Sequence, residues 1–146
     1  MLKEEKMAKE IPEIYIGENW FNIDDILSSY KDESCGAVDI FLGIPRSAPE
    51  DGDVKELHYE AYESMAKKII NEIINEAKQK FGIKHAVVHH RTGVVPVLIP
   101  SFLVAVWSGH RQEAFEACRY IVDEVKARAP IWKKEVFKSG TGQWKE

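Results

Sequence analysis

The amino-acid sequence predicts an α+β fold in a single domain, with its strands paired mainly antiparallel. Apolar and β-branched runs come in pairs between the helical segments, whereas a doubly wound sheet would alternate strand and helix. Two long segments carry apolar residues at helical spacing, and paired strands with short connections favour antiparallel neighbours. A length of 146 residues fits one domain better than two.

The first part of the chain contains three expected strands and one short helix. Residues 1–12 are expected to be disordered or frayed, because they begin with a charged stretch, and this leaves 13–146 as the domain. Asn22 can cap a helix in which Asp24 and Asp25 lie favourably in the first turn. Strands are expected at 14–16, 36–43 and 54–62, and a proline-rich acidic loop at 45–53.

Two longer helices are expected in the remainder of the chain. Ser64 can cap the first, whose apolar stripe ends at Phe81 and is followed by Gly82 as a C-terminal cap. The second begins near His110 and ends before Pro130. Strands are expected at 83–90, 101–107 and 131–137, and the apolar stretch 93–100 is broken by two prolines.

The composition excludes several classes of function. A net charge of −4 argues against a nucleic-acid partner, which would require a basic surface. No window approaches the roughly 18 apolar residues of a membrane span, so we expect no membrane partner and a cytoplasmic location. Cys35 and Cys118 form no CxxC pair and have small or apolar neighbours, which predicts two core thiols in a reducing compartment.

Two basic positions are candidates for binding an anion. His110 and Arg111 follow Gly109 at a predicted strand-to-helix junction, where free backbone N–H groups and the helix dipole favour phosphate. Arg46 follows a buried strand, in a loop from which it can reach a ligand. The alternative for both positions is an ordinary solvated surface residue, and composition alone favours that alternative.

A pair of lysines flanks the turn at the end of the last helix. Lys126 lies in its last turn, and Lys133 follows seven residues later, after Pro130 and next to Trp132. Such a turn can bring both ammonium groups into one pocket, where one lysine can act as a general acid or base or hold a developing anion. The alternative is that basic residues here only favour the C-terminal end of a helix.

Metal and serine-hydrolase chemistry are not expected. His89 and His90 are adjacent on a predicted strand, so their side chains point to opposite faces and cannot share a metal. The sequence contains no HExxH, no HxH and no cysteine pair of the kind that binds zinc. It also contains no G-x-S-x-G motif.

Four segments together resemble the large, catalytic subunit of molybdopterin synthase. The match runs in one register from about the first helix to the C-terminus, and its most specific parts are HR-x-x-AF and K-x-R-x-P-x-WKKE. The resemblance implies an α/β hammerhead-type fold and a homodimer. The matching segments are 36–46 (GAVDIFLGIPR), 58–62 (HYEAY), 109–115 (GHRQEAF) and 126–135 (KARAPIWKKE).

The resemblance also implies a reaction and its partners. Each large subunit binds a small β-grasp, ubiquitin-like subunit, which inserts a C-terminal Gly-Gly tail activated as a thiocarboxylate. Two sulfur transfers then convert cyclic pyranopterin monophosphate into molybdopterin, with no cofactor of the enzyme's own. Lys126 and Lys133 match the catalytic lysines of the family. The implied substrate-binding residues are Arg46, His110, Arg111 and Lys134.

The sequence departs from the family after residue 97. The family usually has a Gly-Glu pair there, whereas this chain has Leu98, Ile99 and Pro100, which replace a polar turn with an apolar one. The alternative to an enzyme is a non-catalytic dimeric module that binds a β-grasp protein or a phosphate ligand, with this apolar stretch in its interaction surface. The two readings differ in whether Lys126 and Lys133 share a pocket with the anion site.

Overall fold

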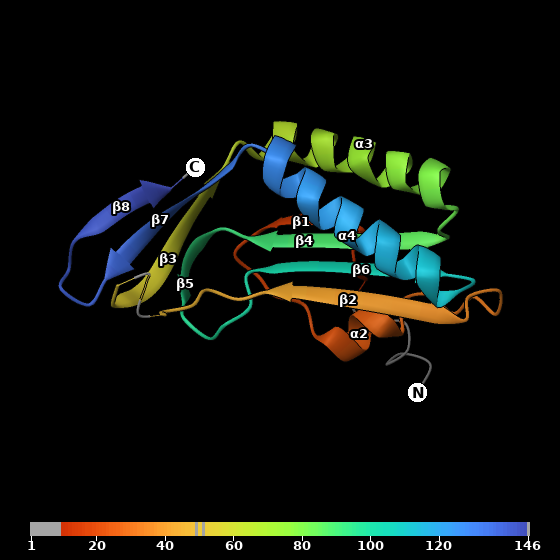
Figure 1. The fold of residues 1–146 in the computed structure, drawn as a ribbon, viewed down its shortest axis with the longest axis horizontal. Coiled ribbons are helices and arrows are strands. Elements are labelled where there is room, and N and C mark those ends of the chain that lie inside the picture. The colour runs from red at the N-terminus through yellow and green to blue at the C-terminus, as the bar shows by residue number, and fades with distance from the viewer. Residues whose placement is uncertain (1–9, 49, 51, 146) are drawn as a thin grey trace.

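The computed structural model describes residues 10–48, 50 and 52–145. The segment 1–12 was expected to be frayed, and its residues 1–9 lie outside the described part of the chain. The described part of the chain forms two four-stranded sheets and three helices (Figure 1). The elements are β1 (Ile14–Gly17), α2 (Ile23–Leu27), β2 (Ala37–Gly43), β3 (Val54–Ala61), α3 (Glu63–Phe81), β4 (His85–Arg91), β5 (Gly93–Pro96), β6 (Phe102–Ser108), α4 (Arg111–Arg128), β7 (Ile131–Phe137) and β8 (Gly142–Lys145).

The first sheet has the strand order β1-β4-β6-β2. Its central strand β6 pairs antiparallel with both β4 and β2, while β1 joins β4 in parallel. Every residue of β6 is buried, because helices cover both faces of this sheet. Val104 and Val106 face α3 and α4, whereas Leu103 and Trp107 face α2. The predicted α+β class is confirmed.

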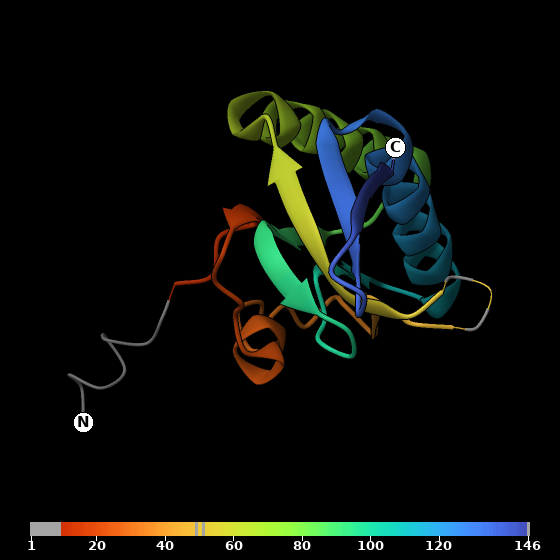
Figure 2. The same ribbon diagram turned by 90° about the vertical axis from the view of Figure 1, so that its left-hand side faces the viewer.

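The second sheet, β5-β3-β7-β8, is wholly antiparallel and stands at one end of the first sheet (Figure 1, Figure 2). Two of its strands were not predicted. β5 ends in Pro96, which an edge strand tolerates because its outer N–H groups need no partner within the sheet. β8 belongs to the glycine-containing tail, which lacks an apolar alternation of its own and is ordered by pairing with β7.

The helix ends largely follow the predicted signals. Asn22 caps α2, since its Oδ1 accepts hydrogen bonds from the backbone N–H groups of Asp24 and Asp25 at 2.7 and 3.3 Å. Gly82 ends α3 in the left-handed conformation, as predicted. Ser64 was wrong as the cap of α3: the cap position is taken by Tyr62, directly after β3, so the helix begins two residues earlier than predicted.

No helix in the described part of the chain is long and apolar enough to cross a membrane. α3 and α4 each bury only one stripe of apolar residues against the first sheet. This is the arrangement of helices that cover a sheet in a water-exposed layer. The two helices lie side by side across β4 and β6 (Figure 1).

Candidate active site

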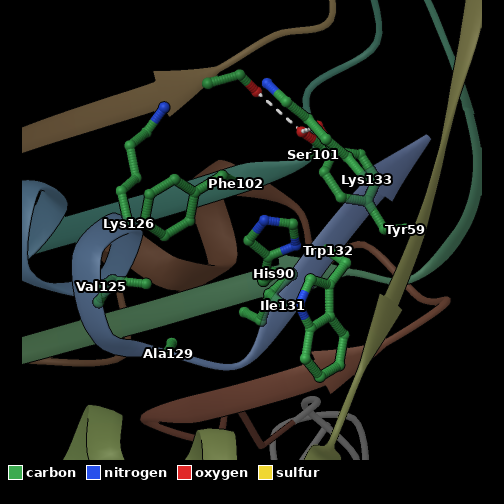
Figure 3. A pocket seen from close by; sticks show the side chains of 11 residues that line it. Tyr59, His90, Ser101, Phe102, Val125, Lys126, Ala129, Ile131, Trp132 and Lys133 are labelled. Carbon is green, nitrogen blue, oxygen red and sulfur yellow. Dashed lines mark hydrogen bonds between the residues drawn. The ribbon is translucent and has the colours of Figure 1, made fainter. Parts of the chain in front are cut away.

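A pocket of about 280 Å³ lies where the C-terminal end of α4 meets the two sheets (Figure 3). α4 contributes Lys126 to its wall, β7 contributes Lys133, and β4 contributes His90. Tyr59 and Ser101 lie on the side of the pocket where β3 approaches the start of β6. Side chains from both sheets therefore form one concave site, as ligand sites commonly require.

The turn at Pro130 brings the two predicted lysines into this pocket. α4 ends at Arg128, Ala129 is already extended, and β7 begins at Ile131, so the chain reverses within a few residues. Figure 3 shows the side chains of Lys126 and Lys133 on either side of His90 and Phe102, extending the same way. The lysine pair thus shares one pocket, which is the arrangement that general acid–base or anion-holding chemistry requires.

An ion-pair cluster fixes the end of α4 that carries Lys126. Arg128 donates from Nη1 and Nη2 to the two carboxylate oxygens of Glu76 on α3, at 2.8 and 3.0 Å. Tyr120 donates to the same carboxylate at 2.7 Å. The hydrogen bonds from Arg128 have the largest effect on the pKa of Glu76, and the one from Tyr120 adds to it. Together they lower this pKa to about 2. The bidentate geometry makes this pair more directional than most surface ion pairs.

A hydrogen-bonded pair of hydroxyls joins the two sheets beside the lysines. The hydroxyl groups of Tyr59 and Ser101 lie 3.0 Å apart, and both residues are buried. The Ser101 hydroxyl lies 3.5 Å from the carbonyl oxygen of Gly43, to which the Ser101 backbone N–H also donates. Burial raises the pKa of Tyr59, so its phenol remains protonated near neutral pH. The sequence offered no local signal for this pair, because 42 positions separate its members.

His90 also lines the pocket, a role that the sequence did not predict for it. Only 8% of it is exposed, and its ring contacts the rings of Tyr59 and Phe102 at centroid distances of 4.8 and 5.1 Å. Its Nδ1 lies 2.8 Å from the carbonyl oxygen of Arg91. Burial, reinforced by the positive charges of Lys126 and Lys133, lowers the pKa of His90 to about 4. His90 is therefore neutral at physiological pH.

The other predicted site residues of the same chain do not line this pocket. Arg46 is exposed and pairs with Glu50 at 3.7 Å. Lys134 alternates with Lys133 along β7, so it points to the other face, where its Nζ lies 6.0 Å from the centre of the Trp144 ring. His110 occupies the N-cap position of α4 and Arg111 is its first residue, so both lie at the opposite end of the helix from Lys126. Within one chain, the length of α4 separates the His110–Arg111 pair from the two lysines.

The histidines do not converge on a common metal site. His89 and His90 point to opposite faces of the first sheet, as predicted: His89 lies against Tyr15 and Phe21, and His90 lies in the pocket. Among the described residues, one group of possible metal ligands has its atoms within 4.8 Å of one another, and its members are Asp32, Cys35 and His85. This group lies at the opposite end of β4 from the pocket. Its Asp32 carboxylate already pairs with the His85 ring at 3.0 Å.

Comparison with known proteins places this geometry in a family. The family model described as MoaE protein matches residues 16–128. A molybdopterin synthase catalytic subunit of Thermoplasma volcanium is 40% identical over 131 residues, which cover 90% of this chain and 96% of that protein. A catalytic subunit of the same name from Bos taurus is 38% identical over 141 residues, covering 97% of this chain and 74% of that protein.

Solved structures agree with the sequence comparison. The crystal structure of molybdopterin synthase from Staphylococcus aureus superposes with a TM-score of 0.87 at 29% identity, covering 93% of this chain and 98% of that one. A complex of subunits 1 and 2 of molybdopterin-converting factor from Helicobacter pylori has the same fold, with a TM-score of 0.75 at 23% identity over 92% of this chain and 91% of that one. Family model, relatives and fold agree, and the chain belongs to the MoaE family, whose curated relatives are molybdopterin synthase catalytic subunits.

Proposed function

We propose that this chain is the catalytic subunit of a molybdopterin synthase and that the pocket around Lys126 and Lys133 is its site of sulfur transfer. The substrate is cyclic pyranopterin monophosphate, and the sulfur donor is the C-terminal thiocarboxylate of a small ubiquitin-like subunit. The observation that carries the proposal is the presence of both lysines in one pocket. Membership of the family supports the reaction class.

The charges in the pocket suit the reactants. The pterin carries a phosphate and the donor ends in an anionic thiocarboxylate, so two cations in a partly enclosed site favour the entry of both. The sulfur of the thiocarboxylate attacks a substrate carbon and forms a C–S bond, while the substrate oxygen at that carbon leaves. The acyl group still bonded to that sulfur joins the small subunit to the pterin as a thioester until water cleaves it to a carboxylate, and a second donor supplies the second sulfur.

Each lysine has a role that its position allows. We assign to Lys133, beside Trp132, assistance in the attack and in the departure of the substrate oxygen, as a proton donor. Lys126 holds the tail carboxylate or the developing oxyanion as a fixed cation. The neighbouring Tyr59 and Ser101 hydroxyls bond to each other, so they stiffen the wall between the sheets.

A groove beside the pocket suits the tail of the small subunit. It runs past Glu60, Trp132 and Trp144 and shares Lys126 with the pocket. Both tryptophans are about half exposed, and such rings commonly anchor a bound chain. A narrow Gly-Gly tail that follows this groove would deliver its terminal sulfur to the lysines. The Helicobacter pylori structure, a complex of two subunits, supports assembly with a small partner.

A homodimer would complete the anion site. Arg111 and Lys126 lie at opposite ends of α4, about 22 Å apart at 1.5 Å per residue, so one chain cannot place both around one phosphate. We propose that His110 and Arg111 of a second copy reach the pocket. An apolar groove between β2 and α4 offers a contact surface close to those residues, with Ile40 in its wall and Phe115 59% exposed.

Reconstitution tests the proposed function. The purified chain would be mixed with cyclic pyranopterin monophosphate and a thiocarboxylated small subunit, and molybdopterin would be followed as its oxidised fluorescent derivative. The control is the same small subunit with an ordinary C-terminal carboxylate, which has no sulfur to transfer. Product only with the thiocarboxylate supports the enzyme. A stable complex without product would favour a non-catalytic binding module.

A further inference from the structure

His90 places a hydrogen-bond acceptor in a pocket whose charged groups are donors. Its Nδ1 lies 2.8 Å from the Arg91 carbonyl oxygen, which can only accept, so Nδ1 carries the proton. In a neutral imidazole the second nitrogen, Nε2, then has a free lone pair. Among the described residues, the hydrogen bond recorded for the His90 ring is the one through Nδ1. Figure 3 shows this far edge of the ring turned toward the space between Lys126 and Lys133.

The surroundings hold the ring in this orientation. Tyr59 meets it edge to face, with an interplanar angle of 72°, and Phe102 packs against it at 30°. The titratable groups that face it come from three elements: Tyr59 on β3, Lys126 on α4 and Lys133 on β7. Protonation of His90 would add a third positive charge beside the two lysines, so the site favours the neutral ring. The Tyr59 hydroxyl is already engaged with Ser101.

We propose that His90 is a substrate-binding residue whose Nε2 accepts a hydrogen bond from an N–H or O–H group of the bound pterin. This inference rests on the proposed function. The lysines select for negative charge and cannot accept a hydrogen bond, so they do not distinguish one phosphorylated compound from another. An acceptor at a fixed position adds that distinction, because a ligand without a matching donor would cover the nitrogen and leave it unpaired.

The adjacent histidine provides a matched control. His89 is also buried, and its Nε2 lies 2.7 Å from the carbonyl oxygen of Pro12, so each histidine bonds one backbone carbonyl. Its side chain points to the opposite face of the sheet, away from the pocket. His89→Phe and His90→Phe therefore remove the same kind of structural hydrogen bond. Only the second removes an acceptor from the pocket.

Binding of cyclic pyranopterin monophosphate and steady-state kinetics would be measured for both variants and for His90→Gln, whose amide oxygen can occupy the position of Nε2. We expect His90→Phe to raise the Kd and KM for the pterin on the order of tenfold, with a much smaller change in kcat, and His90→Gln to recover most of that loss. His89→Phe should leave the Kd and KM for the pterin near the wild-type values. The Kd for the small subunit should not change in any variant.

Two outcomes would overturn the inference and remain distinguishable. If His89→Phe and His90→Phe weakened pterin binding equally, the effect would be structural and His90 would have no part in recognition. If His90→Phe bound the pterin as wild type does, the acceptor would be irrelevant. A wild-type chain that bound no pterin would instead overturn the proposed function, and this inference with it.

Discussion

At the scale of single residues, burial separates two cysteines that look alike in the sequence. Cys118 lies on the core-facing side of α4, where burial and the nearby carboxylate of Asp39 raise its pKa to about 12. Cys35 is only half buried, beside Asp32 in the turn before β2. Two core thiols were predicted, and this is confirmed for Cys118 alone.

The two thiols should therefore differ in reactivity. In the native protein at pH 8 we expect Ellman's reagent to modify Cys35 and to leave Cys118 unmodified, because a thiol that is buried and protonated is a poor nucleophile. In denaturant both should react. A Cys35→Ser variant should show no reactive thiol until it is unfolded. Equal native rates for the two cysteines would contradict the burial assigned to Cys118.

At the scale of elements, the contact between α3 and α4 sets the position of Lys126. The Glu76–Arg128 pair joins the two helices close to the pocket. Because the pKa of Glu76 falls from its ordinary value of 4.5 to about 2, the ionised pair stabilises the fold above about pH 4.5. That contribution is lost as the pH falls from 4.5 through 2.

Replacing Glu76 should reveal this dependence. Glu76→Gln is expected to lower the Tm at pH 7, and its difference from wild type should shrink as the pH falls below 4.5, because the wild-type carboxylate is then progressively protonated. Thermal unfolding at a series of pH values would measure it. Glu63→Gln, which breaks an exposed pair with Lys67 on the same helix, is the control and should have little effect. A Tm difference that is constant from pH 7 to pH 3 would contradict the assignment.

The turn between β5 and β6 carries backbone strain at Leu98. Leu98 has a φ of 75°, a conformation that glycine adopts freely and a leucine does not, and its side chain is 81% exposed. Leu98→Gly should therefore raise the free energy of unfolding by up to about 1 kcal/mol, as chemical denaturation can measure. A clear loss of stability would show that the leucine side chain makes a stabilising contact. Activity offers a second readout of whether this turn affects assembly.

The elements with strong local patterns were predicted, and those that depend on distant partners were not. The helix stripes, the Asn22 and Gly82 caps and the buried β6 follow from spacing within one segment. β5 and β8 are strands only because β3 and β7 pair with them. The lysine pair could be predicted because a short turn joins its members, whereas His90 and the Tyr59–Ser101 pair meet only through the packing of one sheet against the other.

At the scale of the whole molecule, the pocket exists because the second sheet stands at one end of the first. α4 spans the first sheet from Arg111, the proposed phosphate-binding residue at its start, to Lys126 near its end, so the proposed site needs two copies of the chain. A site shared between two copies allows inactive variants to complement each other, which a monomeric enzyme does not allow. Two inactive variants, one with its defect at the start of α4 and the other with its defect in the lysine pocket, can restore each other.

Subunit mixing tests the shared site. Lys133→Ala and Arg111→Ala homodimers should each be inactive or nearly so, because every site in them has one defect. After exchange of subunits, half of the dimers would be mixed and each would have one intact site, so activity should recover to about a quarter of wild type. Two Lys133→Ala preparations mixed together serve as the control. The absence of recovery after verified exchange would contradict a site built from both copies.

The role of Lys133 in the chemical step is the central claim, and a single-turnover measurement tests it most directly. Wild type and Lys133→Ala would be mixed in excess with cyclic pyranopterin monophosphate and thiocarboxylated small subunit, and the Kd for that subunit would be measured in the same preparations. For Lys133→Ala we expect a rate of molybdopterin formation lower by about 10²-fold or more, with the Kd nearly unchanged, because the lysine acts on the reacting atoms. Equal losses of binding and rate would contradict it and would make Lys133 a docking residue.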